Sequence, residues 1–467
     1  MGVRFLGRYV RFSRASAADS RRIKEGDIFW ALPGPHYDGH DFVFDALQKG
    51  AAGAVVRETW WASRGCQRIT DPDSQKRAPS DIVVVADTLK ALGDLGIWWR
   101  RRHGVTVVGI TGSSGKTTTK EMVAGICGLT QKTLKNEGNF NNLIGLPLTL
   151  LGLKETHDTA VLEMGMNRPG EIARLTEIAA PDVGVILNIG MAHLEGLGTL
   201  QGVAHAKCEM IERMPSNGLM VLNGDDGPLM KNAERYGVRK LTFGYGRENN
   251  VRATKIEPLD KRGFRFTLVY GNDAWPVRIH LPGRHNVSNA LAAAAVSFGL
   301  GASSKMILKG LSAYRGMKGR FMMHSFPGGV TVVDDTYNAN PSSLKAALAS
   351  IKTLAGEEDR LIVCLAEMLE LGEATVRSHW EAGKWVSESG ADLFFAFGSH
   401  KTDMKAGAIA GGLPEERIRL VDDHNEMIKG ICDSIGEGTL VFLKGSRKMA
   451  LDRVVEGLAG ALKHGRN

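Results

Sequence analysis

The segment Gly109–Met122, with the sequence GITGSSGKTTTKEM, contains residues typical of a loop that binds nucleotide phosphates. Glycines let backbone N–H groups turn toward phosphate oxygens, and the start of the following helix adds a positive potential. Lys116 is expected to reach the β- and γ-phosphates, and the Thr117 hydroxyl is expected to bind Mg²⁺. The triphosphate should lie against Gly112, Ser113, Ser114, Gly115, Lys116, Thr117 and Thr118.

This phosphate loop is shorter than the usual one. The frame G-x-x-x-x-G-K-[ST] is met only in its second half, by Gly115, Lys116 and Thr117. A simple Gly/Ser turn before an ordinary helix is the alternative, but an apolar strand, the loop, the Lys-Thr pair and a helix follow one another in the required order. The loop therefore predicts nucleotide binding, although it does not identify the reaction.

Three other side chains could bind a metal ion, and each has an ordinary structural alternative. Glu163 ends an apolar strand and can ligate Mg²⁺, but a solvated glutamate is equally compatible with its position. His193 lies in a Gly-rich loop, where a lone histidine is more often structural. Lys207 lies in a predicted helix; if burial kept its amine neutral, the amine would be nucleophilic and could take up CO₂ to form a metal-binding carbamate.

Polar residues later in the chain could contact the nucleoside. Asn286 and Asn289 lie at i and i+3 in an apolar helix, where their amides could read an adenine edge or cap the helix. Arg320 would by default be a solvated charge. Asp335 follows a predicted strand and could hold ribose hydroxyls, or it could serve as a turn or capping residue.

The predicted elements divide the chain of 467 residues into three zones, which agrees with about one domain per 150 residues. Strands alternate with helices in the second zone, and the third zone repeats the alternation without its own phosphate loop. This pattern predicts an α/β protein with a doubly wound, mostly parallel central sheet, a Rossmann-like C-terminal domain and a smaller N-terminal α/β domain. Sites gather at the carboxyl ends of such strands. The predicted domains are residues 1–103, 104–316 and 317–467.

Composition limits the class of protein. The net charge of +8 could indicate nucleic-acid binding, but the basic residues are dispersed, so we expect no nucleic-acid partner. Five scattered cysteines without C-x-x-C spacing indicate a reducing compartment and no disulfide framework. No apolar run is long enough to span a bilayer, and no secretory signal is evident. We therefore expect a cytoplasmic protein.

Eight sequence blocks follow one another along almost the whole chain: TGSSGKTTTKEM, GNFNNLIGLPLTLL, EMGMNRPGEI, NIGMAHLEGLG, AHAKCEM, GRHNVSNALAAAA, DDTYNANPSSLKAAL and LKGSRKMALDRVV. In content and order they resemble the ATP-dependent Mur ligases of peptidoglycan synthesis, whose phosphate loop is similarly short. YNANPSS and AEMLELGE are closer to the subgroup that adds D-alanyl-D-alanine. One departure is AEM at Ala366–Met368, where the subgroup usually shows G-D-M.

The resemblance implies roles for individual residues. Lys116 and Thr117 would bind phosphate and Mg²⁺, Glu163 would bind Mg²⁺, and His193 with a carbamylated Lys207 would hold a second Mg²⁺. Asn286 and Asn289 would contact adenine, Arg320 a phosphate, and Asp335 the ribose. Ser20 and Arg21 would contact the uridine nucleotide. The residues that would lie near the dipeptide and the closure surface are Asn338, Lys444, Ser446 and Arg447.

The reaction implied by the resemblance is the ATP-dependent joining of D-alanyl-D-alanine to UDP-N-acetylmuramoyl-tripeptide through an acyl phosphate. We expect a monomer whose domains close on the nucleotide. The alternatives are the tripeptide-forming Mur ligase or folylpolyglutamate synthase, both of the same fold. Two further alternatives are not ligases: a P-loop small-molecule kinase or ATPase, and a binding protein that has lost catalysis.

Overall fold

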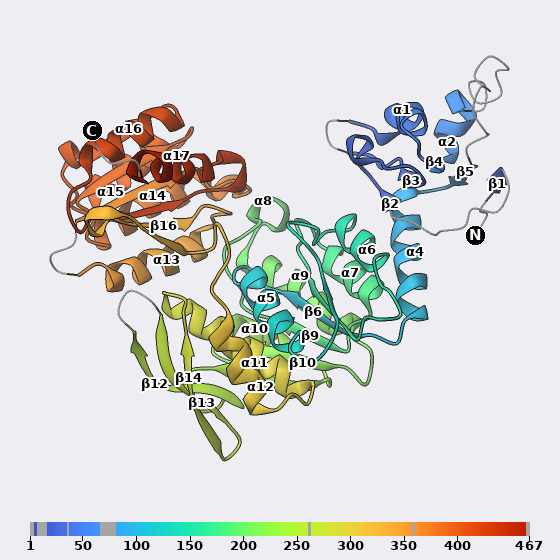
Figure 1. The fold of residues 1–467 in the computed structure, drawn as a ribbon, viewed down its shortest axis with the longest axis horizontal. Coiled ribbons are helices and arrows are strands. Elements are labelled where there is room, and N and C mark those ends of the chain that lie inside the picture. Colours follow the sequence, from blue (N-terminus) through green and yellow to red (C-terminus); the bar gives the residue numbers. More distant parts are fainter. Residues whose placement is uncertain are drawn as a thin grey trace.

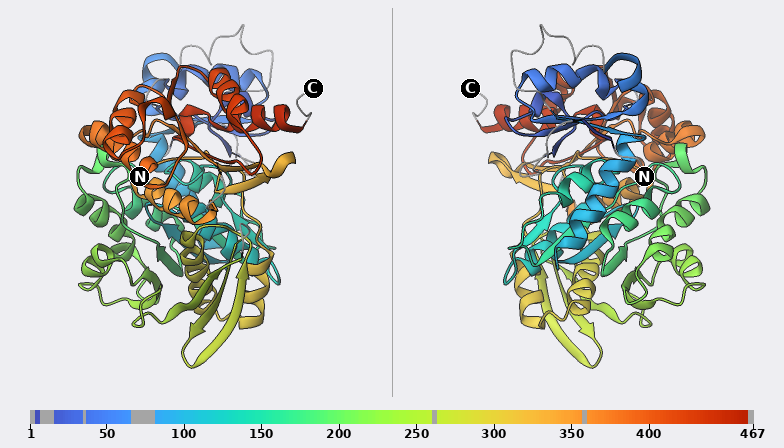
Figure 2. Two further views of the ribbon diagram at one scale, coloured as in Figure 1. Left: turned by 90° about the vertical axis from the view of Figure 1, so that its left-hand side faces the viewer. Right: turned by 90° about the vertical axis from the view of Figure 1, so that its right-hand side faces the viewer.

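Three β-sheets with flanking helices make up the described part of the chain, residues 4–6, 16–34, 37–65, 81–259, 263–356 and 360–463 of this computed structural model. In Figure 1 the N-terminal sheet (blue) and the C-terminal sheet (orange to red) lie on opposite sides of the view. Figure 2 shows that both adjoin the same end of the middle part, opposite the β12–β14 strands. The three mostly parallel sheets confirm the predicted fold class. Within the described residues, no helix is both long and apolar enough to cross a lipid bilayer.

The N-terminal sheet has the strand order β1-β5-β4-β3-β2, and only the β1–β5 pair is antiparallel. Helix α4 then leads into the middle part, where it packs on α6 and α7. The Asp87 side chain caps α4 by accepting the Lys90 N–H. The elements are β1 (Arg4–Leu6), β2 (Ser16–Ala17), η1 (Ser20–Arg22), β3 (Ile28–Trp30), η2 (Gly39–Phe42), α1 (Val43–Gln48), β4 (Gly53–Arg57), α2 (Glu58–Trp60), η3 (Trp61–Gly65), β5 (Asp81–Val85) and α4 (Thr88–Arg102).

The middle sheet has the order β14-β13-β12-β11-β10-β9-β6-β8-β7, with β6 to β12 parallel and β13 and β14 antiparallel. The predicted strands of this zone are present, whereas the hairpin formed by β13 and β14 was not predicted. The strands are β6 (Thr106–Thr111), β7 (Thr133–Lys135), β8 (Thr159–Glu163), β9 (Val183–Ile186), β10 (Leu219–Asn223), β11 (Arg239–Gly244), β12 (Val251–Pro258), β13 (Phe264–Tyr270) and β14 (Asp273–Ile279). The helices are α5 (Lys116–Cys127), α6 (Gly145–Leu150), α7 (Glu171–Ala179), α8 (Leu194–Leu197), α9 (Leu200–Arg213), α10 (Gly227–Ala233), α11 (Arg284–Gly299) and α12 (Ser304–Ala313).

The strand order reverses at β6. The chain runs from β6 to the edge strand β7, returns to β8, and then crosses to β9 on the other side of β6. At such a switch point the loops after neighbouring strands diverge and leave a crevice beyond the carboxyl ends. The phosphate loop follows β6, Glu163 ends β8, and the loop with His193 follows β9, so these three candidates share one edge.

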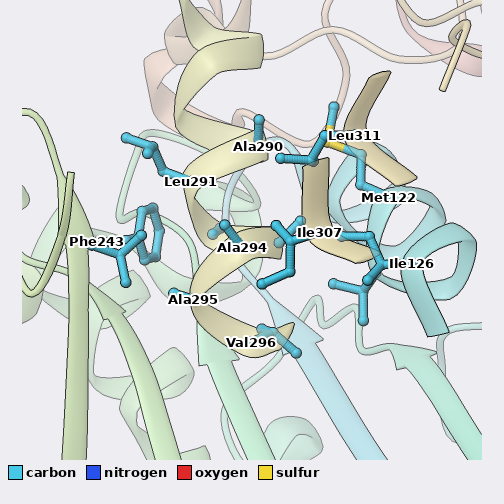
Figure 3. Packing of buried hydrophobic residues seen from close by; sticks show 14 of the residues in the cluster. Met122, Ile126, Phe243, Ala290, Leu291, Ala294, Ala295, Val296, Ile307 and Leu311 are labelled. Carbon is cyan, nitrogen blue, oxygen red and sulfur yellow. The ribbon is translucent and has the colours of Figure 1, made fainter. Parts of the chain in front are cut away.

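Helix α11 is the centre of the largest hydrophobic cluster in the middle part (Figure 3). Its alanines let the helix approach both the sheet and the neighbouring helices, as Figure 3 shows for Ala294 between Phe243 of β11 and Ile307 of α12. Ile126 of α5 lies on the same side of α11 as Ile307 (Figure 3). The sequence NALAAAAV belongs to the predicted apolar helix of Asn286 and Asn289, and its burial shows that it is a packed core helix.

Replacing Ile307 by alanine should lower the free energy of unfolding by about 3 kcal/mol, because the side chain is fully buried and its neighbours cannot fill the cavity. Equilibrium urea unfolding measures this loss. Ile409→Ala is the control, since Ile409 is 42% exposed and should lose less than about 0.5 kcal/mol. Equal losses at the two positions would contradict the packing described here.

The C-terminal sheet has the order β15-β16-β20-β17-β18-β19, and only β15 is antiparallel to its neighbour. Asp335 and Lys444 end the adjacent strands β16 and β20 and are paired in register. The strands are β15 (Met322–Ser325), β16 (Thr331–Asp335), β17 (Leu361–Ala366), β18 (Leu393–Phe397), β19 (Ile418–Val421) and β20 (Leu440–Lys444). The helices are η6 (Pro327–Gly329), α13 (Pro341–Leu354), η7 (Gly372–Ala374), α14 (Thr375–Glu388), α15 (Lys401–Ala410), η8 (Glu415–Arg417), α16 (His424–Ser434), η9 (Arg447–Met449) and α17 (Asp452–Lys463).

Candidate active site

The phosphate loop connects β6 to the start of α5, as the sequence predicts. Gly115 has φ of 81°, and a Cβ at this position would lie 2.3 Å from Oδ1 of Asn289, so only glycine fits. The loop is fixed from the β9 side, because the Ser114 N–H donates to Oδ1 of Asn188 at 2.9 Å and Oγ of Ser113 donates to the Gly190 carbonyl at 3.0 Å. Helix α5 begins at Lys116, so its positive end faces the loop.

Lys116 lies across the phosphate loop. Its Nζ donates to the Gly112 carbonyl at 2.7 Å. Burial lowers the pKa of Lys116, while the nearby Glu163 carboxylate favours the charged form. The ammonium group is therefore held over the position where phosphate oxygens are expected.

Glu163 is a buried, fixed carboxylate and not a solvated strand end. It is 3% exposed. Its Oε2 accepts the Thr117 hydroxyl at 2.8 Å, and its Oε1 accepts Nδ2 of Asn141 at 2.8 Å. The Asn136 side chain holds the backbone of Glu163 through two hydrogen bonds of 2.9 Å: its Nδ2 donates to the Glu163 carbonyl, and its Oδ1 accepts the Glu163 N–H. We assigned no role to Asn136 or Asn141, although Asn141 lies in the GNFNN block; only the fold shows that both meet Glu163.

Replacing Asn141 by alanine should raise the Mg²⁺ concentration needed for half-maximal activity about tenfold, because groups that hold a metal-binding carboxylate affect metal affinity by this order. A Mg²⁺ titration of initial rates measures the effect. Asn139→Ala is the matched control, since Asn139 is exposed in the same loop. An unchanged Mg²⁺ requirement in Asn141→Ala would contradict the role given to Glu163.

Arg320 reaches the phosphate loop from the C-terminal part of the chain. Its Nη2 donates to Oγ1 of Thr117 at 2.8 Å, and its guanidinium carbon lies 3.9 Å from the centre of the Tyr337 ring. The default expectation of a solvated charge is therefore wrong. The stacked ring and the hydroxyl fix the guanidinium beside the loop, where an anion could accept from it.

His193 and Lys207 lie near Lys116. His193 follows β9 with φ of 56°, and its Nδ1 is 2.8 Å from Oε2 of Glu370, which belongs to the C-terminal part. Burial lowers the pKa of His193, Glu370 opposes this shift, and Lys116 and Lys207 add to it. Lys207 is 1% exposed, and within the described residues its Nζ makes no hydrogen bond or ion pair. Burial lowers the pKa of Lys207 well below its usual value.

Asn286 and Asn289 lie beside the phosphate loop and do not cap their helix. The N-cap of α11 is Gly283, and no side chain caps it. Nδ2 of Asn289 donates to Oδ1 of Asn286 at 3.1 Å, and Nδ2 of Asn286 donates to the Pro282 carbonyl at 2.7 Å. The capping alternative is therefore wrong for this pair.

Among the C-terminal candidates, Asp335 and Lys444 are buried and paired, whereas Asn338 is exposed and joins them through its backbone carbonyl. Nζ of Lys444 donates to Oδ2 of Asp335 at 2.6 Å and to the Asn338 carbonyl at 3.0 Å. Asp335 does not cap α13, whose N-cap is Asn340. Oγ of Ser446 accepts the Leu369 N–H, and Arg447 pairs with Asp452 on the surface.

The N-terminal candidates, Ser20 and Arg21, and the AEM stretch at Ala366–Met368 lie outside the group of residues around the phosphate loop. Arg21 is exposed and pairs with Asp19 at 2.9 Å, whereas Ser20 is buried beside Asp45 of α1. In the described residues, no hydrogen bond joins either of them to the phosphate loop, so their role in binding a uridine nucleotide stays a prediction. Glu367 of the AEM stretch accepts the Ser399 N–H at 3.0 Å and therefore faces its own domain.

Several contacts join the C-terminal part to the loops of the middle part, among them the Glu370–His193 contact described above. Besides the Arg320–Thr117 bond, Nδ2 of Asn340 donates to the Ser113 carbonyl at 3.3 Å, and Oγ of Ser342 accepts the Met191 N–H at 3.0 Å. The site is thus assembled from two parts of the chain. This arrangement corresponds to docked domains, and the predicted opening without nucleotide stays a prediction.

The comparisons with known proteins agree with this geometry. The family described as Mur ligase middle domain matches residues 110–297, and the Mur ligase, glutamate ligase domain matches residues 319–447. The UDP-N-acetylmuramoyl-tripeptide–D-alanyl-D-alanine ligase of Bacillus subtilis is 34% identical, over 95% of this chain and 92% of that protein.

Solved structures give the same result. A crystal structure of MurF from Acinetobacter baumannii superposes with a TM-score of 0.84 at 32% identity, covering 96% of this chain and 93% of that chain. MurF ligase from Thermotoga maritima in complex with ADP has a TM-score of 0.82 at 29% identity, covering 97% and 98%. The chain belongs to the Mur ligase family, and it is an ATP-dependent peptide ligase of the MurF type.

Proposed function

We propose that this protein joins D-alanyl-D-alanine to UDP-N-acetylmuramoyl-tripeptide and converts ATP to ADP and phosphate. The observation that carries the proposal is the meeting of the phosphate loop, the Glu163 carboxylate and the Arg320 guanidinium at the Thr117 hydroxyl. Relatives with this activity in their names align over 95% of the chain. A kinase reading leaves the contribution of the C-terminal part unexplained.

The phosphate acceptor would be the terminal carboxylate of the peptide. A carboxylate resists attack by an amine, because its charge repels the nucleophile and oxide is a poor leaving group. An oxygen of the carboxylate attacks the γ-phosphorus, the bond to the bridging oxygen breaks, and ADP leaves. The amine nitrogen of the dipeptide then attacks the acyl carbon, loses a proton, and expels inorganic phosphate. The amide formed retains one of the two original carboxylate oxygens.

Lys116 and Arg320 would stabilise the charge that moves during phosphoryl transfer. Both are positively charged groups fixed before the reaction, one by the Gly112 carbonyl and the other by the Tyr337 ring and Thr117. Fixed charges of this kind need no reorganisation when the transition state forms. They also reduce the repulsion between the anionic acid and the anionic triphosphate.

The residues at Thr117 fit a magnesium ion. A hydroxyl and a carboxylate supply the oxygen ligands that Mg²⁺ prefers, and Mg²⁺ usually completes its shell with water and substrate phosphate oxygens. When bound, the ion would neutralise phosphate charge and orient the triphosphate. Thr117 and Glu163 are the residues that we expect to hold it.

A second ion would need an oxygen donor beside His193, because imidazole alone is a poor partner for Mg²⁺. Lys207 could supply one. A buried ammonium group without a partner is costly, so burial favours the neutral amine. The neutral amine can add to CO₂ and lose a proton, which gives a carbamate with two oxygens. We therefore include carbamylated Lys207 and a second Mg²⁺ in the proposal.

The remaining assignments follow from position. Adenine would lie by Asn286 and Asn289, of which Asn289 is next to Gly115 of the phosphate loop, and ribose by Asp335, as the resemblance to the family implies. The N-terminal domain, residues 1–103, would hold the uridine nucleotide through Ser20 and Arg21, and residues 104–316 would bind ATP. Residues 317–467 would bind the dipeptide near Asn338, Lys444, Ser446 and Arg447. We further propose that the protein acts as a monomer in the cytoplasm.

The test is product identification by mass after incubation with ATP, Mg²⁺, UDP-N-acetylmuramoyl-tripeptide and D-alanyl-D-alanine. The expected product is the UDP-muramoyl-pentapeptide, with one ADP released per amide formed. Parallel reactions with UDP-muramoyl-dipeptide plus diamino acids, and with a folate plus glutamate, test the two alternative ligases. A stable phosphorylated product or ADP release without an amine would instead support the kinase or ATPase alternative.

A further inference from the structure

The loop that follows β17 in the C-terminal part reaches back to the His193 loop of the middle part. Glu370 in this loop has φ of 65°, and His193 has φ of 56°. Left-handed conformations are disfavoured for residues with a side chain, and they persist where the surroundings impose them. Two such residues from different parts of the chain therefore meet at one contact.

Side chain and backbone both contribute to this contact. Oε2 of Glu370 lies 2.8 Å from Nδ1 of His193, and the Glu370 carbonyl accepts the Glu195 N–H at 3.2 Å. Gly372 packs directly on Glu195: a Cβ at Gly372 would lie 3.0 Å from the Glu195 Cα, and φ there is 54°. The position of the Glu370 backbone is thus set by docking of the two loops.

The side-chain contact has a consequence for the imidazole ring. Nδ1 lies beside the carboxylate oxygen without the alignment of a hydrogen bond in this structure, and Nε2 is the nitrogen left to face another ligand. A carboxylate that accepts from one ring nitrogen fixes the tautomer and the orientation of a metal-binding histidine, and it increases the basicity of the ring. The Glu370 side chain is 48% exposed, and an ordinary ion pair with this exposure contributes little to the stability of the protein. The backbone conformations at both residues argue for a positioning role.

We propose that Glu370 is a positioning residue that orients His193 for metal binding, so that the metal site of the middle part is completed only when the C-terminal part is docked. The inference rests on the proposed function for the identity of the His193 site. Glu370 itself would touch neither the substrate nor the reacting atoms.

A double-mutant cycle in Mn²⁺ binding tests this proposal. The variants are Glu370→Gln, His193→Ala and the double variant, each titrated with Mn²⁺ in the presence of a non-hydrolysable ATP analogue and followed by electron paramagnetic resonance. Glu370→Gln should weaken one class of Mn²⁺ site about tenfold. In the His193→Ala background the same change should have no further effect, because the two residues act through one contact.

Glu373→Gln is the matched control, since Glu373 is exposed in the same loop and the change removes the same charge. It should bind Mn²⁺ like the wild type, and thermal unfolding should show that all variants are folded. Equal Mn²⁺ affinity in Glu370→Gln and Glu373→Gln, or additive effects in the cycle, would overturn the proposal. No acceptor substrate is used, so a failure of the proposed ligase reaction would be seen separately in the product assay.

Discussion

Replacing Lys116 by methionine should lower kcat/KM for ATP about a thousandfold. The ammonium group lies across the phosphate loop, fixed by the Gly112 carbonyl, where it would contact phosphate oxygens as charge moves during transfer. Methionine keeps the length of the side chain and removes the charge. Steady-state ADP release with detection of the amide product measures the change.

Lys305→Met is the control for this prediction. Lys305 is exposed near the start of α12, so its replacement removes the same charge from another helix N-terminus. We expect wild-type kinetics for Lys305→Met. A loss of less than tenfold in Lys116→Met would show that the loop does not hold the transferred phosphate as described.

Replacing Lys207 by alanine should lower kcat by about a thousandfold, because loss of a metal ligand removes several kcal/mol of transition-state stabilisation. The stability of the protein should not fall in parallel. Within the described part of the chain the Lys207 amine makes no hydrogen bond or ion pair, so its removal breaks no polar contact of the protein. Steady-state rates and thermal unfolding together separate a catalytic role from a structural one.

A direct observation of the carbamate accompanies this variant. Wild-type protein in ¹³C-bicarbonate should show a carbamate carbon signal in its ¹³C spectrum, and Lys207→Ala should not. Lys231→Ala, an exposed lysine of α10, is the control and should keep both the rate and the signal. Undiminished turnover in Lys207→Ala would remove Lys207 from the metal site.

Features that depend on residues close together in the chain could be predicted from the sequence. The phosphate loop could be predicted because a strand, two glycines, Lys116 and a helix must follow one another within a few residues. Glu163 was found for a similar reason, since parallel strands end at one edge of a sheet. For Asn286 and Asn289 the spacing gave a shared helix face, but it could not decide between capping and a ligand contact.

Features that depend on contacts between distant segments were not predictable in this way. Asn136 and Asn141 hold Glu163, and Tyr337 holds Arg320, only because separate loops converge in the fold. Glu370 lies 177 positions from His193 in a loop of another sheet, so no local pattern connects them. The β13–β14 hairpin was missed because its strands carry mixed polar and apolar residues and extend the sheet beyond the alternating helices.

The central claim is that the peptide carboxylate receives the γ-phosphoryl group before the amine attacks, and oxygen transfer tests it most directly. UDP-N-acetylmuramoyl-tripeptide labelled with ¹⁸O in both oxygens of its terminal carboxyl group is converted with unlabelled ATP, and the phosphate released is analysed by mass. The account predicts one ¹⁸O atom in each phosphate formed and one in each new amide. Release of unlabelled phosphate during amide formation would contradict it.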